Sequence, residues 1–413
     1  MRKLPYLPRR ARWAVPAAAV AAAGGLLAGS MMSGAAAAPR LPARSAGQLL
    51  AAVTASEPPL SGTITETAAL GLPALPGAGA LGSGSPLPAA SLLAGSHTVQ
   101  IWYAGPEHYR LALPQRMSED DLVRSGTSGW LWDSAANTVT HLTLPATAPA
   151  PSGPAVPLTP QQAARQALAA AGPATTVRVD PTVTIAGQAA YQLVLAPKSH
   201  SSLIGQVRIA IDSRRHVPLR VQVFARGAAS PAAEVGFTAI SFTPPPAADY
   251  AFTPPAGATV TRQHLGAASL GQAGRQASGT ASGIRVIGTG WLAVAALPES
   301  SLATLTGGAG GSDLIPFRHS SSSGAPGSAA PGHPGAALAG SLLGAALNSA
   351  PRVSGSWGSG RLIRTSLLSV LVTRTGRVLI GAVTPDVLYR AATQSGHPLT
   401  SLGQHAASRV RPK

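Results

Sequence analysis

The residues that could carry chemistry in this chain are few and scattered. There is no cysteine, which excludes disulfides, thiol catalysis, thiolate metal sites and a lipid-modified N-terminal cysteine. The ten histidines show no HExxH motif and no Cys/His spacing, and no GxSxG, SxxK or Walker sequence is present. We therefore predict that the protein is not an enzyme and that it holds no metal and no cofactor.

The densest group of ionisable side chains is the run Glu119, Asp120 and Asp121. On a strand these three acids would point alternately to both faces, so we interpret them as a solvated edge or loop. Asp133 and Asp212 each stand at the end of a predicted strand, where capping of a turn explains them.

A formal GxGxxG occurs at Gly77, Gly79 and Gly82. A dinucleotide site needs this motif to open a helix, so that the phosphate meets the helix N-terminus. Prolines surround the motif here, and we interpret it as part of a mobile loop.

The element around which the chain is organised is the stretch 203–226. Val207, Ile209 and Ile211 alternate with polar or small residues, and a second alternating run follows from Leu219 to Val223. A period of two is typical of strands, and the residues 213–216 between the runs predict a hairpin. One face is aliphatic and the other carries Arg208 and Arg220, which we expect to face water.

Further alternating runs from residue 60 to residue 252 predict about ten strands in all. Their apolar positions are expected to form one inward layer. That layer comprises Val99, Ile101, Tyr103, Tyr109, Leu111, Leu113, Trp130, Trp132, Leu193, Leu195, Ile209, Ile211, Val221, Val223 and Phe237.

Only two short helices are predicted beside these strands, over 45–54 and over 160–171, the second capped by Thr159 with Pro160 at its first position. Each residue of the inward layer could simply pack beneath these helices. As a set, however, the strands present more apolar surface than two helices can cover, so we predict a cavity or a partner for the surplus. Ile209, Ile211, Val221 and Val223 are expected to floor a lipid-sized cavity.

Composition and charge indicate how much of the chain is linker and which partners it would attract. The 413 residues include 46 glycines and 38 prolines, so much of the chain is predicted to be linker. The net charge of +17 would draw the protein to anionic lipid or polyanions. Because the basic residues form no dense run or aromatic-studded stripe, we do not expect nucleic-acid binding.

Residues 1–40 resemble an export signal. Five basic residues precede an uncharged run from Trp13, and the small residues Ala36, Ala37 and Ala38 lie at its end. Cleavage after Ala38 is one interpretation and an uncleaved membrane anchor is the other. In both cases we expect the body of the protein to be exported, either secreted or anchored at the outer face of the plasma membrane.

The C-terminal part is predicted to contain one further small unit, over 283–395. It would consist of a β-like stretch, a helix over 336–347, and a hairpin around 374–376 followed by a helix, with a Gly/Ser/Ala-rich linker at 300–335. Residues 261–282 are expected to be a linker and 396–413 a disordered tail.

Several pieces of the chain together resemble the LolA-like lipoprotein-carrier superfamily, which includes the N-terminal domain of MucB/RseB regulators. They are SGTITETAALGLP, HTVQIWYAGPEHYRLAL, the hairpin that begins WLWDSAANTVT, and VRIAIDSRRHVPLRVQV. The resemblance covers residues 45–260 and is closest to extracytoplasmic actinobacterial proteins. It implies an α+β fold: a strongly curved antiparallel half-barrel with helices on its concave face and an apolar cavity for acyl chains.

Two functions follow as expectations. The first is an exported, non-enzymatic protein that binds the acyl chains of lipids or lipoproteins in the half-barrel. The alternative is a RseB-like regulatory module that binds a membrane-bound anti-sigma factor, with the membrane surface as a further partner.

Overall fold

The computed structural model describes residues 39–55, 57–71, 94–115, 117–145, 159–264, 284–298 and 349–395. The predicted export signal, the GxGxxG loop, the helix over 336–347, the linker 300–335 and the tail 396–413 lie outside these residues.

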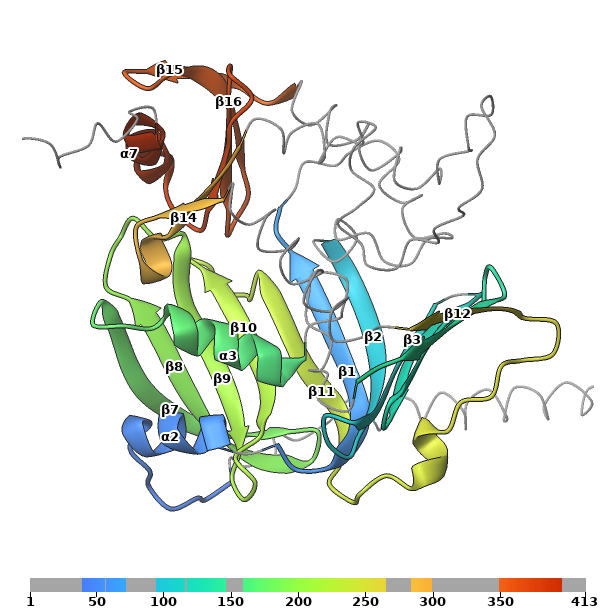
Figure 1. The fold of residues 1–413 in the computed structure, drawn as a ribbon. Coiled ribbons are helices and arrows are strands. Elements are labelled where there is room, and N and C mark those ends of the chain that lie inside the picture. Colours follow the sequence, from blue (N-terminus) through green and yellow to red (C-terminus); the bar gives the residue numbers. More distant parts are fainter. Residues whose placement is uncertain are drawn as a thin grey trace, which may run out of the picture. The chain divides into compact units, whose positions relative to one another are not determined.

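One large sheet of twelve strands dominates the described chain (Figure 1). Its order is β12-β6-β5-β4-β3-β2-β1-β11-β10-β9-β8-β7, so β12 and β7 are its edges and the sheet is not closed. The strands are β1 (Leu60–Ala69), β2 (Ala94–Tyr103), β3 (His108–Pro114), β4 (Glu119–Ser125), β5 (Ser128–Asp133), β6 (Thr138–Thr143), β7 (Thr175–Ile185), β8 (Gln188–Pro197), β9 (Ile204–Asp212), β10 (Pro218–Ala225), β11 (Ala233–Ser241) and β12 (Thr259–His264).

The sheet is curved and antiparallel except for the pair β12–β6, which is parallel. The predicted fold class, an α+β half-barrel, is confirmed, with twelve strands where about ten were expected. The additional strand β12 comprises the last residues of the predicted domain and the first residues of the expected linker. Its pairing places Thr259 opposite Thr138 and His264 opposite Thr143, so this part of the chain is structured.

The hairpin predicted at 203–226 forms as β9 and β10, with Val221 opposite Ile209 and Val223 opposite Val207. Its turn is capped as expected for a strand-end carboxylate. Asp212 Oδ1 accepts hydrogen bonds from the backbone N–H groups of Arg214 and Arg215. Asp133 caps its own turn in the same way, through a 2.9 Å hydrogen bond from the Ala136 N–H group.

Two α-helices lie on one face of this sheet, called here the inner face; the opposite face is called the outer face (Figure 1). They are α2 (Ala46–Ala55) and α3 (Pro160–Ala170). Helix α3 begins with a capping box, in which the Thr159 side chain accepts from the Gln162 N–H group and the Gln162 side chain accepts from Thr159. Its Ala163 and Ala164 are buried, and such small side chains let the helix approach β10 and β11 closely.

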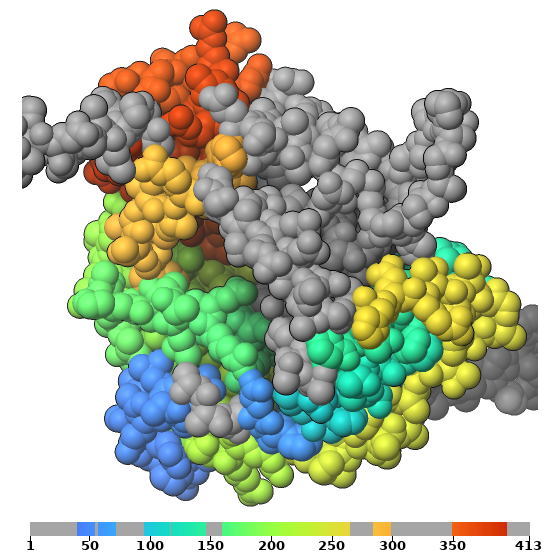
Figure 2. Space-filling model, viewed as in Figure 1, coloured from blue at the N-terminus to red at the C-terminus, as the bar shows by residue number. Residues whose placement is uncertain are grey.

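The core of the large sheet lies between the inner face and these helices. Leu49 and Val53 from α2 and Ala164 from α3 pack in it with Leu193, Ile209 and their neighbours on β8–β10. In the space-filling view, α3 and α2 cover the inner face at the β7–β10 side (Figure 2).

The described part of the C-terminal unit has more strands than predicted. It is a six-stranded sheet in the order β13-β14-β18-β17-β16-β15, with helix α7 (Pro385–Ser395) packed on β14, β17 and β18. The predicted hairpin is β17–β18. The strands are β13 (Arg285–Ile287), β14 (Val294–Leu297), β15 (Arg352–Gly355), β16 (Gly358–Arg364), β17 (Ser369–Thr373) and β18 (Val378–Gly381).

This second sheet has a core of its own, centred on Leu371, Leu379 and Leu388, each of which is fully buried. It is joined to the large sheet by an antiparallel bridge between Ser202 and Val383. Trp291, in the short 3-10 helix η5 (Gly290–Leu292), adds a 2.7 Å hydrogen bond from its Nε1 to Thr175 Oγ1.

Candidate functional site

A pocket of about 210 Å³ opens on the inner face, between the first turn of α3 and strands β1–β3, β10 and β11. Its lining combines an apolar floor with a polar mouth. The lining residues are Glu57, Pro58, Leu60, Ile101, Tyr103, Pro106, Tyr109, Leu111, Thr159, Pro160, Gln161, Gln162, Arg165, Val217, Pro218 and Phe237.

The floor is made by side chains that strand register brings together. Leu60 lies opposite Tyr103 on β2, and Ile101 lies opposite Leu111 on β3. Phe237 enters from β11, beside a β-bulge in that strand, where Thr238 is the extra residue opposite Thr63 and Ile64 of β1. Gly62 makes room for it, because a Cβ there would lie 2.4 Å from the Ala239 carbonyl oxygen and 3.0 Å from the Phe237 ring.

The mouth carries a small polar network. Glu57 forms an ion pair with Arg165 of α3 and accepts a 3.2 Å hydrogen bond from the Tyr103 hydroxyl group. Burial raises the pKa of Tyr103 above its usual value of 10.0, so the tyrosine stays a neutral donor. Both charged side chains of the pair are about half exposed, and the pair therefore stabilises the mouth only weakly.

Two further polar residues, Gln161 and Tyr109, belong to the lining. Gln161 Oε1 is buried and has no hydrogen-bond partner within the described residues. Tyr109 lies opposite Arg124, which is 1% exposed. Burial raises the pKa of Tyr109 to about 12, against the opposing effect of the Arg124 charge. A ligand with an apolar end and a hydrogen-bonding group would match this combination.

Five residues of the predicted inward layer line the pocket: Ile101, Tyr103, Tyr109, Leu111 and Phe237. Sequence reasoning missed the rest of its wall, including Leu60, Val217 and Arg165. The capping sequence Thr159-Pro160 was the one available signal for this wall, because it marks where α3 begins and therefore which residues form its first turn.

A second group of predicted residues lies in the core and does not line the pocket. Leu113 and Val223 are partly buried and pack against this core. The fully packed members of the group are Val99, Leu193, Leu195, Ile209, Ile211 and Val221. The expectation that Ile209, Ile211, Val221 and Val223 floor a lipid-sized cavity is therefore corrected. Helices α2 and α3 cover that part of the inner face more completely than their short lengths suggested.

Trp130 and Trp132 lie on the outer face, which corrects their predicted place in the inward layer. In the strand register, Trp130 lies opposite Val123, and Val123 lies opposite Arg110, so these three residues share one face. The next residue, Leu122, points to the other face and packs against the core. Trp130 stacks on His141 with ring centroids 3.9 Å apart, and both tryptophans contact the ring of Phe252.

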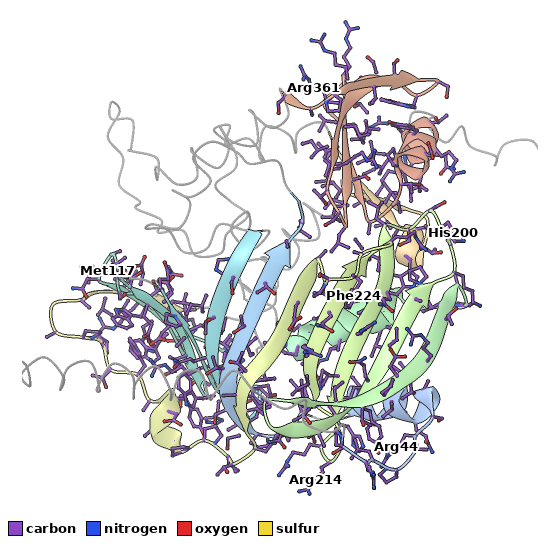
Figure 3. All side chains as sticks on the ribbon, turned by 180° about the vertical axis from the view of Figure 1, so that it is seen from behind. Arg44, Met117, His200, Arg214, Phe224 and Arg361 are labelled. Atoms are coloured by element: carbon purple, nitrogen blue, oxygen red, sulfur yellow. The ribbon has the colours of Figure 1, made fainter. Side chains whose placement is uncertain are left out.

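Arg208 and Arg220 are on the outer face as predicted, but neither is fully exposed. The guanidinium group of Arg208 lies 4.7 Å from the Phe224 ring centroid. Figure 3 shows Phe224 on that side of the sheet.

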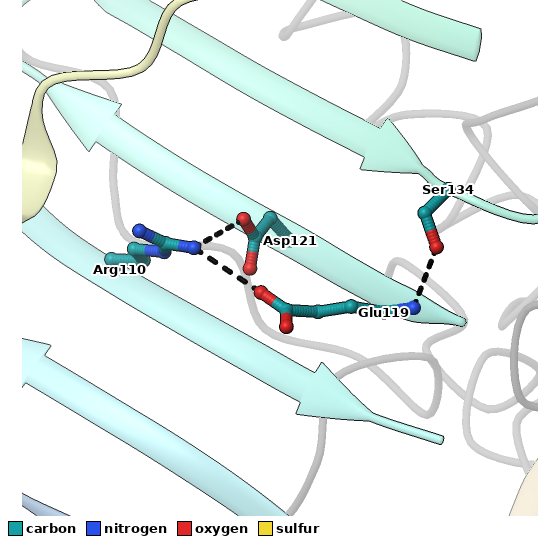
Figure 4. A network of polar contacts seen from close by, with 4 residues as sticks. All are labelled: Arg110, Glu119, Asp121 and Ser134. Atoms are coloured by element: carbon teal, nitrogen blue, oxygen red, sulfur yellow. Dashed lines mark hydrogen bonds and ion pairs between the residues drawn. The ribbon is translucent and has the colours of Figure 1, made fainter. Parts of the chain in front are cut away.

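The acidic run is not the solvated edge that we expected. Asp121 is 4% exposed on the outer face, where the Arg110 guanidinium group donates to Asp121 Oδ2 at 2.6 Å and to Glu119 Oε1 at 3.2 Å (Figure 4). Burial raises the pKa of Asp121 to about 6; the Arg110 charge opposes this rise and the Glu119 charge adds to it. The ion pair with Arg110 only partly offsets the desolvation of the carboxylate.

Asp120 points to the inner face, opposite Asp133. Burial and the Asp133 charge raise its pKa to about 6, despite a 2.7 Å hydrogen bond from Gln115. Burial and the charges on neighbouring strands account for the raised pKa of each carboxyl group, and neither Asp120 nor Asp121 lines the pocket.

Within the described ranges, no group of three or more His, Cys, Asp or Glu side chains could hold a metal ion. The helices that the structure describes are also too short, or insufficiently apolar, to cross a membrane.

No family model matches this chain, and no curated protein matches it. Among solved structures, MucB in the MucA/MucB complex of Pseudomonas aeruginosa is similar at 12% identity, over 84% of this chain and 96% of that chain, with a TM-score of 0.38. A LolA superfamily protein from Nitrosomonas europaea is similar at 10% identity, over 51% and 99%, with a TM-score of 0.18. A conserved protein of Thermus thermophilus is similar at 13% identity, over 53% and 99%, with a TM-score of 0.29.

These values describe a distant likeness in chain path. One of the three is a LolA superfamily protein and another is the MucA/MucB complex. The predicted actinobacterial origin stays a prediction.

Proposed function

We propose that this protein is an exported, non-enzymatic binding protein that holds the apolar end of an acyl chain, from a lipid or a lipoprotein, in the pocket beside α3. The observation that supports this most is the floor of Leu60, Ile101, Leu111 and Phe237 beneath a polar mouth. The proposal keeps residues 1–40 as an export signal or anchor and residues 45–260 as the binding domain.

The size of the pocket limits how much of a ligand it holds. At about 210 Å³ it is smaller than the pockets of roughly 300 Å³ or more that bury drug-sized ligands. It has the volume of about seven water molecules. Burying a similar number of methylenes would contribute on the order of 5 kcal/mol before ordering costs. Without those costs the dissociation constant would be on the order of 0.1–1 mM, and the costs make it larger, so we propose reversible capture of a chain end.

The test is to purify the protein from its own host, extract bound lipid, and measure uptake of a labelled fatty acid and a labelled acyl peptide. The variant Leu111→Trp would fill the pocket and should lower uptake at least about tenfold. Val286→Trp, at a position 68% exposed on β13, is the matched control and should leave uptake unchanged. An empty protein that takes up neither probe would contradict the proposal.

A regulatory module is the second candidate, and one observation in the small sheet favours it. Strand β13 is an edge of that sheet, and its Val286 is 68% exposed beside Ile284 at 40%. An exposed apolar edge is a surface to which an extended peptide can add as a further strand. The partner would be the exported segment of a membrane-bound anti-sigma factor.

This second candidate is tested by pull-down from host membranes with the full chain and with Val286→Lys, a substitution that protects strand edges. Retention of a membrane protein by the full chain, lost in the variant, is expected. Equal retention by both, or none by either, would count against it.

A further inference from the structure

Three exposed arginines gather at one end of the large sheet. Arg214 and Arg215 lie in the β9–β10 turn, and Arg44 lies just before α2. The Arg44 guanidinium carbon is 6.0 Å from the ring centroid of Tyr191, which is paired with Ile211 beside that turn. Figure 3 shows Arg44 and Arg214 at the same end of the sheet.

The surrounding structure holds these side chains outward. Asp212 fixes the backbone of the β9–β10 turn by accepting from the N–H groups of Arg214 and Arg215. The Arg215 guanidinium carbon lies 4.4 Å from the Phe242 ring centroid, a cation–π distance. Near Arg44, the Tyr191 hydroxyl donates to the Pro42 carbonyl at 2.9 Å and fixes that segment to the sheet. The charges are therefore presented on ordered backbone.

The charges at this end are not neutralised by acidic side chains. Among the described residues, the ion pairs involve Arg110, Arg165 and Arg178, and none includes the three arginines here. Asp212 is 2% exposed and its carboxylate is engaged by the turn. Glu57 is paired with Arg165. Guanidinium groups free of carboxylates bind phosphate oxygens well.

The chain itself limits how far this end can lie from a membrane. Arg44 follows Ala38, the last residue of the predicted export segment, by six residues. Six extended residues span at most about 20 Å. If the segment is retained as an anchor, Arg44 stays within about 20 Å of it. If it is cleaved, the new N-terminal ammonium group adds positive charge to the same stretch.

We propose that this end of the large sheet docks on an anionic membrane surface, with Arg44, Arg214 and Arg215 binding lipid phosphates. Val217 and Pro218 directly follow the turn and line the pocket, so docking brings the pocket toward the lipid headgroups. The docking itself does not depend on what the pocket binds.

The test compares the exported full chain with the triple variant Arg44→Gln, Arg214→Gln and Arg215→Gln. Binding is measured on phosphatidylcholine vesicles with and without phosphatidylglycerol. Each arginine should contribute about fivefold, so the triple variant should bind the anionic vesicles on the order of 100-fold more weakly. High salt should weaken the binding of the unsubstituted protein.

A matched control removes the same charge elsewhere: Arg352→Gln, Arg364→Gln and Arg374→Gln, all exposed on the small sheet. It should lower binding by no more than about twofold. Hydrogen exchange provides a second measurement that also works for an anchored chain. Anionic vesicles should protect residues 213–216 and neutral vesicles should not.

Equal loss in the control and the triple variant would show that net charge alone acts, and would overturn the docking site. Equal protection of residues 213–216 by both kinds of vesicle would overturn it as well. Uptake of labelled fatty acid in the absence of vesicles should be the same in the triple variant, which separates this proposal from that of the pocket.

Discussion

On the β7–β10 side of the inner face, Leu193, Leu195 and Ile209 are fully buried within a core to which α2 and α3 contribute. On the β1–β3 side, Ile101, Leu111 and their neighbours line a pocket. The residue types are the same on the two sides. The helices make the difference, because α3 packs on β10 and β11 and its first turn forms a wall of the pocket. The inner face of one sheet can thus be a packed core over one part and be left with a pocket over another.

Removing a leucine side chain from each side should have different effects on stability. Leu193→Ala leaves a closed cavity and should lower the free energy of unfolding by about 3–4 kcal/mol. Leu111→Ala enlarges a space that is already open, so most of the cavity penalty is absent and about 1–2 kcal/mol should be lost. Urea unfolding followed by circular dichroism measures both. Equal losses would mean that the pocket side is packed as tightly as the other.

The pH dependence of the free energy of unfolding should come mainly from carboxyl groups of β4, which lies in the same half of the sheet as the pocket. The folded pKa values of Asp120 and Asp121 are raised to about 6 from 3.8. The native state therefore binds more protons than the unfolded state between these values. The contribution of each group to stability is greatest below pH 4, and it is lost as the pH rises through about 6.

For Asp120, a rise in pKa from 3.8 to about 6 corresponds to about 3 kcal/mol, and solvent screening reduces the expected change to about 1–2 kcal/mol between pH 4 and pH 7. Asp120→Asn should flatten this part of the stability curve, and Asp386→Asn in α7 is the control. Unfolding midpoints in urea across this pH range provide the measurement. An unchanged slope in Asp120→Asn would assign the pH dependence to other groups.

The smallest expected effect concerns the mouth. Tyr103→Phe removes the hydrogen bond to Glu57 and leaves the apolar wall in place. The free energy of unfolding should fall by about 0.5–1 kcal/mol, and uptake of a purely apolar probe should hardly change. Calorimetric titration and urea unfolding separate the two effects. A large loss of uptake would show that the mouth, and not the floor, holds the ligand.

Much of the fold could be predicted because alternation along a strand is a local property. The hairpin at β9–β10, the two strand-end aspartates and the capped start of α3 each depend on neighbouring residues, and all three were predicted. The twelfth strand could not be, because β12 is short and polar and is defined only by its parallel pairing with β6.

The candidate site was predictable only in part. Ile101, Tyr103, Tyr109, Leu111 and Phe237 were placed on the inner face correctly. The wrong placement of Trp130 and Trp132 has a definite cause. Leu131 between them is also apolar, so both faces of β5 could have been the inner one. Likewise, Glu119 and Asp121 share one guanidinium group only because β3 brings Arg110 beside them.

Backbone periodicity and local hydrogen bonds were enough to predict most strands of the large sheet, which side chains share a face within a strand, and how the turns at Asp133 and Asp212 are capped. The tertiary structure alone decided which face of β5 turns inward, which carboxylate is buried and where the apolar layer stays open. Those outcomes depend on the register between strands and on where α3 lies across the sheet, and both are set by contacts between residues far apart in the chain.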